Sequence, residues 1–174
     1  MRINRFSDLA LRLLMYLGSR ANPTQATVTV RSAAFMFNVP YSHLVKVAHQ
    51  LGQQGFLITS KGGGGGLRLA RPAESISIAD ILRATEPTGS IIDCASQLCP
   101  LTGACILKDA LDDAYAAFFS VLERYSLAEI AKTPRLQKLV LLTPVRSSSR
   151  IPRIGRRAAD IPTSKSRSRV HRSI

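Results

Sequence analysis

The chain has 174 residues, of which 45% are hydrophobic, and its 24 Lys and Arg outnumber 11 Asp and Glu to give a formal net charge of +13. This length suits one domain of ordinary size with an extra element, and the chain lacks the run of about 18 apolar residues that a membrane-spanning helix needs. Residues 1–8 are polar and charged and do not form an apolar secretory signal, so we expect a cytoplasmic protein with no membrane partner.

Three helices are expected in the first part of the chain. Apolar residues recur at three- and four-residue steps over Arg5–Arg20, which is the spacing of an amphipathic helix. A second helix is expected over Val30–Phe37, and Asn38-Val39-Pro40 forms a short turn before a third helix, from about Ser42 to Gln54. The buried face of this third helix is expected to consist of Leu44, Val47, Ala48 and Leu51.

Two short strand-like runs follow, over residues 56–60 and 67–70. Lys61 and five consecutive glycines, residues 62–66, separate the two runs. The order helix, helix, turn, helix and hairpin is that of a winged helix-turn-helix, in which these glycines would form the wing.

Three further helices are expected in the second half. The first is capped by Ser77, with Asp80 completing an approximate capping box, and a loop over residues 87–102 follows it. The segment from Cys105 to Tyr125 carries one long, narrow apolar stripe, which is typical of a helix packed against a partner helix. A capping box at residues 126–129 opens a short last helix. The fold class is therefore mainly α with a small β-hairpin wing, a winged helix-turn-helix plus a long dimerisation helix.

The composition divides the chain into three parts. Residues 1–72 are expected to form the winged helix-turn-helix domain, and residues 73–142 a cysteine-containing loop with the dimerisation helices. Residues 143–174 are rich in Ser, Pro and Arg without apolar periodicity, so we expect a disordered basic tail. This tail either adds non-specific affinity for DNA or is an inert appendage, and both alternatives stay open.

The third helix is the candidate DNA-reading element. Residues 1–72 hold nine Lys and Arg against one acid, Asp8, and a polar helix that follows a short turn can enter the major groove. Both observations favour DNA as partner over a merely solvated polar surface. Base contacts are expected from the start of the helix, at Tyr41, Ser42, His43 and Lys46. Contacts with the phosphate backbone are expected from Arg2, Arg5, Arg12, Lys61 and Arg68.

The three cysteines of the chain, Cys94, Cys99 and Cys105, are spaced C-x4-C-x5-C and all lie in one segment. An odd, clustered set in a cytoplasmic protein argues against structural disulfides and favours a metal site over three ordinary thiols. Iron–sulfur clusters take thiolate ligands, whereas structural zinc sites usually have two closely spaced cysteine pairs, which this chain lacks.

A fourth ligand would have to come from outside this loop or from a neighbouring acid. Asp8 is the only acid among the first 73 residues, but a carboxylate at a helix start is also favoured by the helix dipole alone. Acids also occur near the cysteines, and loop or exposed helix positions explain them equally well: Asp93, Asp109, Asp112 and Asp113. A [2Fe–2S] cluster would use ligands similar to those of a [4Fe–4S] cluster, so the residues leave its nuclearity open.

Four segments carry a resemblance to a known family. These segments are Met1–Arg12 (MRINRFSDLALR), Val39–His43 (VPYSH), the wing ending in Gly66–Ala70 (GLRLA), and the three cysteines followed by Ile106–Leu111 (ILKDAL). Together they resemble the iron–sulfur winged-helix transcriptional repressors, specifically the nitric-oxide-sensing NsrR branch, over about residues 1–142. The chain differs from relatives that carry Arg or Lys in the wing, because Gly63 and Gly64 stand there.

The resemblance implies a homodimer that crosses at the long helix and binds a pseudo-palindromic DNA operator. It implies a [4Fe–4S] cluster held by Cys94, Cys99 and Cys105 of one subunit and by the partner's Asp8. Nitric oxide would attack the iron, and the DNA-binding domain would then be released from its operator-binding arrangement. These implications predict a nitric-oxide-sensitive repressor.

Two other classes of function remain as alternatives. The first is a winged-helix regulator that senses iron–sulfur status, thiol redox state or zinc through the same cysteines. The second is a small redox enzyme or electron carrier, which we disfavour because no docking or substrate apparatus is recognisable. The histidines also form no catalytic arrangement, since His43 and His49 lie on the expected DNA face and His171 in the tail. We therefore expect no enzymatic activity.

Overall fold

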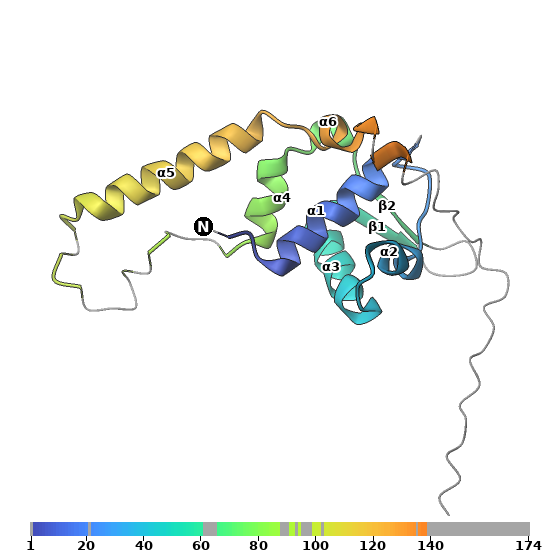
Figure 1. Ribbon diagram of the computed structural model, residues 1–174, viewed down its shortest axis with the longest axis horizontal. Helices are drawn as coiled ribbons and strands as arrows, with labels where there is room; N and C mark the ends of the chain where they lie inside the picture. The colour runs from blue at the N-terminus through green and yellow to red at the C-terminus, as the bar shows by residue number, and fades with distance from the viewer. Residues whose placement is uncertain are drawn as a thin grey trace, which may run out of the picture.

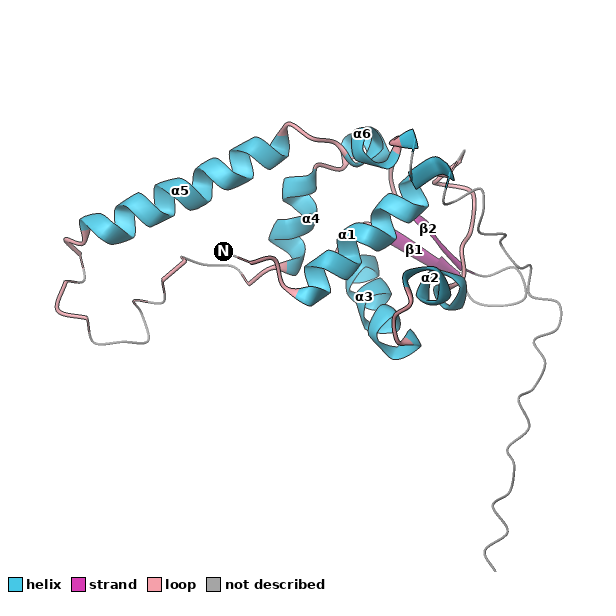
Figure 2. Ribbon diagram, in the orientation of Figure 1, coloured by secondary structure: helices cyan, strands magenta, loops and turns pink. Residues whose placement is uncertain are grey.

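Six α-helices, one short 3-10 helix and a two-stranded hairpin make up the described part of the chain (Figures 1 and 2). The computed structural model describes residues 2–20, 22–60, 66–87, 91–92, 94, 99–101, 103–134 and 136–138. The elements in chain order are α1 (Arg5–Gly18), α2 (Val30–Phe37), α3 (Tyr41–Gln53), β1 (Leu57–Ser60), β2 (Gly66–Leu69), η1 (Ala73–Ser75), α4 (Ile78–Thr85), α5 (Ile106–Glu123) and α6 (Leu127–Ala131). The predicted Lys61, the glycines 62–65, Asp93 and the tail 143–174 lie outside the described residues.

Helix α1 lies at the centre of the core. It packs against α3, α4, α6 and β2, and its inward side chains are buried because they recur on one face of the helix. The Tyr16 ring is fully buried and meets the Phe37 ring edge to face, with 5.8 Å between the ring centroids. The first helix was therefore predicted correctly, although it ends at Gly18 and not at Arg20.

Helices α2 and α3 are joined by a tight turn that requires an unusual backbone conformation. Asn38 ends α2 in the left-handed region, with φ of 51° and ψ of 49°, a conformation that asparagine tolerates better than most residues. Helix α3 then begins at Tyr41, one residue before the predicted start. Its buried face is the predicted one, formed by Leu44, Val47, Ala48 and Leu51. This arrangement is a helix-turn-helix.

The hairpin packs behind this pair of helices. Strands β1 and β2 are antiparallel, with Leu57 opposite Leu69 and Ser60 opposite Gly66. The bounds of the two strands differ by at most one residue from the predicted ranges. The backbone of Val28 pairs with that of Leu67, which ties the hairpin to the segment before α2. A Cβ atom on Gly66 would lie 2.9 Å from the carbonyl oxygen of Val28, so this close approach requires glycine.

Hydrogen bonds of side chains fix the starts of the later helices. Ser77 and Asp80 form a complete capping box at α4, and Ser126 and Glu129 form another at α6. The second box holds the pKa of Glu129 below its ordinary value, because the backbone N–H and then the hydroxyl of Ser126 donate to its carboxylate. Both predicted capping boxes are therefore confirmed.

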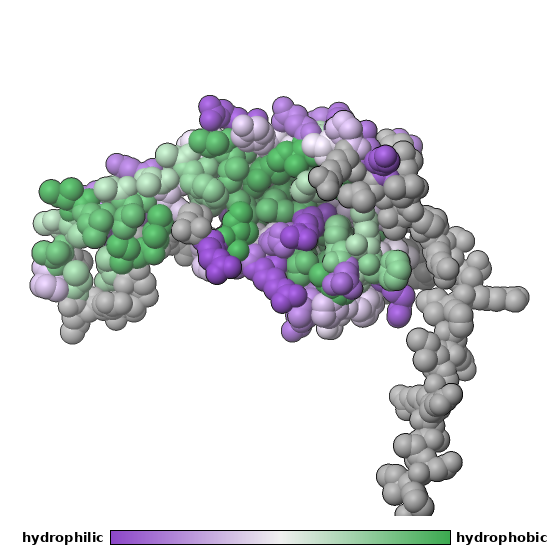
Figure 3. All heavy atoms as spheres, in the orientation of Figure 1, coloured by the Kyte–Doolittle hydropathy of each residue, from purple (hydrophilic) through white to green (hydrophobic). Residues whose placement is uncertain are grey.

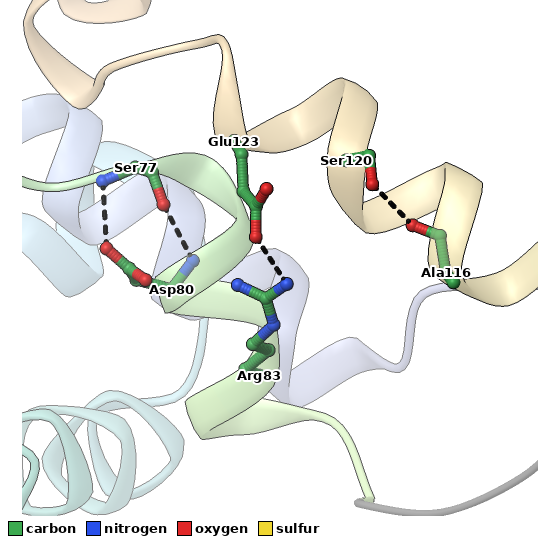
Figure 4. A network of polar contacts seen from close by, with 6 residues as sticks. All are labelled: Ser77, Asp80, Arg83, Ala116, Ser120 and Glu123. Carbon is green, nitrogen blue, oxygen red and sulfur yellow. Dashed lines mark hydrogen bonds and ion pairs between the residues drawn. The ribbon is translucent and has the colours of Figure 1, made fainter.

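Helix α5 extends away from the rest of the molecule (Figure 1). Its C-terminal half is held by Arg83 of α4, which donates to Glu123 at 2.6 Å (Figure 4). The guanidinium carbon of Arg83 also lies 5.0 Å from the centroid of the Phe119 ring. Phe119 is the one side chain of α5 that is fully enclosed, and it packs on Ala79 and Leu82. None of the helices in the described ranges combines the length and the apolar character needed to cross a bilayer.

Candidate DNA-binding face and cysteine loop

The predicted reading helix presents its polar residues to solvent. Its start carries four exposed side chains, while the opposite face is buried against α1 and β1. These four are the predicted base contacts Tyr41, Ser42, His43 and Lys46. The polar, exposed face of α3 can therefore meet the edges of bases in a major groove without unfolding any part of the core.

Some of the arginines predicted to contact phosphates are exposed, and others already have a partner within the chain. Arg2 and Arg5 are exposed and line a hollow of about 540 Å³ at the start of α1. Arg12 is instead paired with Asp8, whose carboxylate lies 2.9 Å from Nε, and Arg68 donates to the carbonyl oxygen of Thr24 at 2.9 Å. The spacing of four residues between Asp8 and Arg12 is a local signal for this pair, but the contact between Arg68 and Thr24 has none.

Asp8 lies in the first turn of α1, where the carboxylate faces the positive end of the helix dipole. Its side chain is about half exposed, as is that of Arg12, so the ion pair is accessible to solvent. Asp8 also lines the hollow at the start of α1 together with Ile3, Asn4 and Leu11. A second molecule could therefore reach this carboxylate from outside the chain.

The cysteines lie between α4 and α5. None of the three forms a disulfide, all three are half-buried, and Cys105 occupies the N-cap position of α5. Gly103 adopts a φ of 92° just before it, a left-handed value that suits glycine and turns the chain into the helix. Among the described residues, no three His, Cys, Asp or Glu side chains lie close enough together to hold a metal ion. The single chain thus supplies the donors on one loop without bringing them together.

These donors fit an iron–sulfur cluster by their chemistry. Half-buried cysteines outside any disulfide can bind iron through their sulfur atoms, whereas cysteines in a disulfide could not. Lys108, in the first turns of α5, forms an ion pair with Asp112, which raises the pKa of Lys108, and Asp109 and Cys94 add smaller effects in the same direction.

The C-terminal end of α4 contacts both α1 and α3, which sequence reasoning missed. The backbone N–H and the side-chain amide of Asn4 each donate to the Glu86 carboxylate at 2.9 Å. Gln50 of α3 donates to the carbonyl oxygen of Ala84 at 3.3 Å. The cysteine loop starts directly after these residues, so its first anchor is bonded to the reading helix and to the cap of α1.

The N-terminal half of α5 has an apolar face that none of the described residues covers. Ile106 is 84% exposed and Leu107 63% exposed, and Val121 and Tyr125 are also exposed farther along. Exposed alanines continue the same stripe between them: Ala110, Ala114 and Ala117. Figure 3 shows apolar side chains gathered along α5 on the face in view. Such a patch on a helix usually marks a protein interface.

A helix-turn-helix with a basic, exposed reading helix and an antiparallel hairpin behind it defines a winged-helix DNA-binding protein. The sequence profile of the Rrf2 family, described as iron-dependent transcriptional regulator, matches residues 3–133. The chain belongs to this family. It is therefore a DNA-binding transcriptional regulator and not an enzyme, as the sequence predicted.

Solved structures of similar proteins share the fold. The oxidized form of CymR from Staphylococcus aureus has 25% sequence identity over 76% of this chain and 98% of that chain, with a TM-score of 0.60. CymR (YrzC) of B. subtilis, described as its global cysteine regulator, has 19% identity, coverage of 75% and 96%, and a TM-score of 0.61. IscR of T. potens has 18% identity, coverage of 76% and 87%, and a TM-score of 0.60. The predicted fold class is confirmed.

Proposed function

We propose that this regulator is a cytoplasmic, nitric-oxide-sensitive repressor of the NsrR branch. It binds a pseudo-palindromic operator as a homodimer while an iron–sulfur cluster is intact and releases the operator when nitric oxide reacts with that cluster. One observation carries the proposal. The loop that holds all three cysteines starts at the end of α4, and this end is hydrogen-bonded to Asn4, the N-cap of α1, and to the reading helix α3.

The ligand set consists of Cys94, Cys99 and Cys105 of one subunit and the partner's Asp8. When bound, a [4Fe–4S] cluster, or a [2Fe–2S] cluster as the alternative, supplies iron that reacts with nitric oxide. The Asp8 carboxylate is a harder and weaker ligand for iron than a thiolate, and it is accessible at the start of α1. Asp8 is therefore the ligand that is easiest to displace.

The chain's own residues would pass this change to the DNA. Asp8 lies one turn after Asn4, and Asn4 is bonded to Glu86 at the start of the cysteine loop. Gln50 ties the reading helix to the same end of α4. A change in the loop or at Asp8 thus acts on residues that set the orientation of α3, and a small rotation removes the match to two half-sites.

The homodimer rests on α5. A second copy of the same apolar stripe would bury Ile106, Leu107 and the exposed alanines. The proposed ligand set requires that the partner's α1 then lies near the cysteine loop. In this proposal residues 1–72 read DNA and residues 73–142 sense and dimerise, while the basic segment 143–174 adds non-specific affinity or is inert.

A regulator that reads iron–sulfur status, thiol oxidation or zinc through the same cysteines is the second candidate. The similarity to an oxidized form of CymR, together with three cysteines that form no disulfide, favours this alternative over other signals. It would use the same hydrogen bonds at the end of α4, from Asn4 to Glu86 and from Gln50 to Ala84. Only the chemistry at the cysteines would differ.

Anaerobic purification followed by nitric oxide titration tests the proposal. The full-length protein is assayed for iron and sulfide, and operator fragments are first selected from a library of duplexes with the cluster-loaded protein. We expect operator affinity to fall as nitric oxide is added, while metal-free protein binds weakly from the start. Equal binding before and after nitric oxide contradicts the proposal. A response to peroxide or to zinc alone, with none to nitric oxide, supports the second candidate.

A further inference from the structure

Arg31 and Tyr41 form a pair across the helix-turn-helix. Arg31 lies in the first turn of α2 and Tyr41 is the first residue of α3, with the left-handed turn at Asn38 between the two helices. The guanidinium carbon of Arg31 lies 5.2 Å from the centroid of the Tyr41 ring. This distance is within the range of a cation–π contact, so the ring holds the cation at the start of the reading helix.

Both residues line an open hollow beside the turn. The hollow has a volume of about 490 Å³, and Ala34, Phe35, Asn38 and Val39 complete its lining. Phe35 is 84% exposed at its edge, an unusual state for a phenylalanine in a folded domain. The hollow is therefore an open surface with an apolar wall and one cation.

No carboxylate of this region can neutralise Arg31. Residues 22–60, which include α2 and α3, contain no Asp or Glu. Within the described part of the chain, the Tyr41 ring is the partner of Arg31, and the one acid of residues 1–72, Asp8, is paired with Arg12. Among the described residues no carboxylate is paired with Arg31, so its N–H donors are open to an anion of another molecule.

We propose that Arg31 contacts a phosphate of the DNA backbone beside the reading helix and that Tyr41 is its positioning residue. A guanidinium above an aromatic ring is held without using its N–H donors, which stay free for the oxygens of a phosphate. The ring also restricts the long Arg31 side chain before DNA binds, which lowers the entropy lost on binding. Tyr41 thus acts through Arg31, and the bases are left to Ser42, His43 and Lys46.

The salt dependence of DNA binding tests this assignment. The full-length protein is titrated into a random-sequence duplex at several salt concentrations, and the slope of log K against log salt is compared between variants. Each lost phosphate contact lowers the slope by about 0.9, so Arg31→Ala lowers it by roughly twice that in a symmetric homodimer. Arg31→Gln, which keeps most of the side-chain length, is expected to give the same loss. Arg124→Ala is the matched control, because Arg124 is also exposed but lies at the end of α5.

Variants of Tyr41 separate positioning from direct contact. Tyr41→Phe keeps the ring and is expected to bind like the wild type, whereas Tyr41→Leu weakens binding severalfold. The double variant Arg31→Ala with Tyr41→Leu is expected to bind no worse than Arg31→Ala alone, because the ring acts through the cation. Thermal melting of every variant shows that the fold is kept.

Some outcomes overturn the assignment. If both Arg31 variants keep the wild-type slope of log K against log salt, Arg31 does not contact a phosphate. Equal losses of DNA affinity in Tyr41→Phe and Tyr41→Leu show that the tyrosine hydroxyl, and not the ring, contributes to DNA binding. The inference rests on DNA binding by the family and not on the nitric oxide signal. Wild-type protein that binds the duplex while Arg31→Ala binds equally well therefore contradicts this inference alone.

Discussion

Asn4 and Glu86 are 82 positions apart in the sequence, yet two hydrogen bonds of 2.9 Å join them. Asn4 caps α1 with its side-chain oxygen, which accepts from the Ser7 N–H at 2.8 Å, and its N–H groups are used by Glu86. The cap of the central helix is therefore held by the residue that ends α4. This link has a measurable effect on stability.

Replacing Glu86 by Ala is expected to destabilise the protein by about 1 to 2 kcal/mol, because two partly buried donors of Asn4 lose a charged acceptor. Urea unfolding of metal-free protein measures the change. Glu74→Ala is the control, since Glu74 makes only an exposed ion pair with Lys132 at 3.6 Å, and such pairs contribute little. Equal unfolding midpoints for the two variants would contradict the role of the link.

Replacing Gln50 by Ala is expected to weaken the coupling between the cysteine loop and the DNA. The variant loses its hydrogen bond to Ala84 but keeps every cysteine, so its iron content should stay at the wild-type level. The ratio of operator affinities before and after nitric oxide is expected to shrink severalfold. Gln53→Ala, an exposed position on the same helix, is expected to keep the full ratio. A wild-type ratio for both variants would show that this bond transmits nothing.

Replacing Ala114 by Glu is expected to convert a homodimer into a monomer. Ala114 lies in the exposed apolar stripe of α5, and a buried, unpaired carboxylate strongly opposes association. Ala116→Glu is a matched control, because Ala116 is exposed on the same helix but lies outside the stripe. Sedimentation velocity measures both molecular masses. If both variants are dimers, or both are monomers, the dimer interface does not lie on the apolar stripe of α5.

Replacing Asp8 by Ala is expected to leave a cluster that is more labile or altered in its absorbance spectrum, because one ligand position loses its carboxylate. Asp109→Ala tests a competing acid, since Asp109 lies in the first turn of α5 close to the cysteines. Anaerobic spectra and the rate of iron loss to a chelator compare the two variants. If the Asp8 variant matches the wild type in both measurements, Asp8 serves only as a helix-start carboxylate paired with Arg12.

The capping box of α6 predicts a small dependence of stability on pH. The pKa of Glu129 is lowered in the folded state, so its ionised carboxylate stabilises the fold at a pH above its ordinary value of 4.5. This contribution is lost as the pH falls through the lower, folded value. Glu129→Gln is therefore expected to narrow the difference in unfolding free energy between neutral and acidic solution, measured on metal-free protein. An unchanged difference would contradict the prediction.

Local sequence signals predicted most of the fold. The helices, their caps and the buried face of α3 follow from periodicity and from Thr29, Ser77 and Ser126, which act within three residues of themselves. The bonds from Asn4 to Glu86 and from Gln50 to Ala84 could not be predicted, because polar residues far apart carry no pattern that pairs them.

The candidate site was predicted less completely than the fold. The cysteine loop and the exposed start of α3 follow from residue type and spacing, but their partners depend on tertiary contacts. Arg12 was expected to contact DNA and is paired with Asp8 in the structure. The pair of Arg31 and Tyr41 went unnoticed because a cation above a ring across a turn has no fixed sequence spacing. The convergence of the cysteines stays a prediction.

Helix α5 is attached to the rest of the molecule by its C-terminal part. Phe119 and Glu123 fix the helix near its C-terminus, while Cys105 stands at the opposite tip. Tyr115 and Phe118 pack against the same cluster as Phe119, and the ten residues from Cys105 to Tyr115 rise about 15 Å, so the thiol lies about 15 Å beyond the attached part of the helix. A ligand bound at Cys105 would therefore lie away from the core, where a neighbouring molecule could contact it. The length of α5 beyond its attached part determines which part of that neighbour could complete the site.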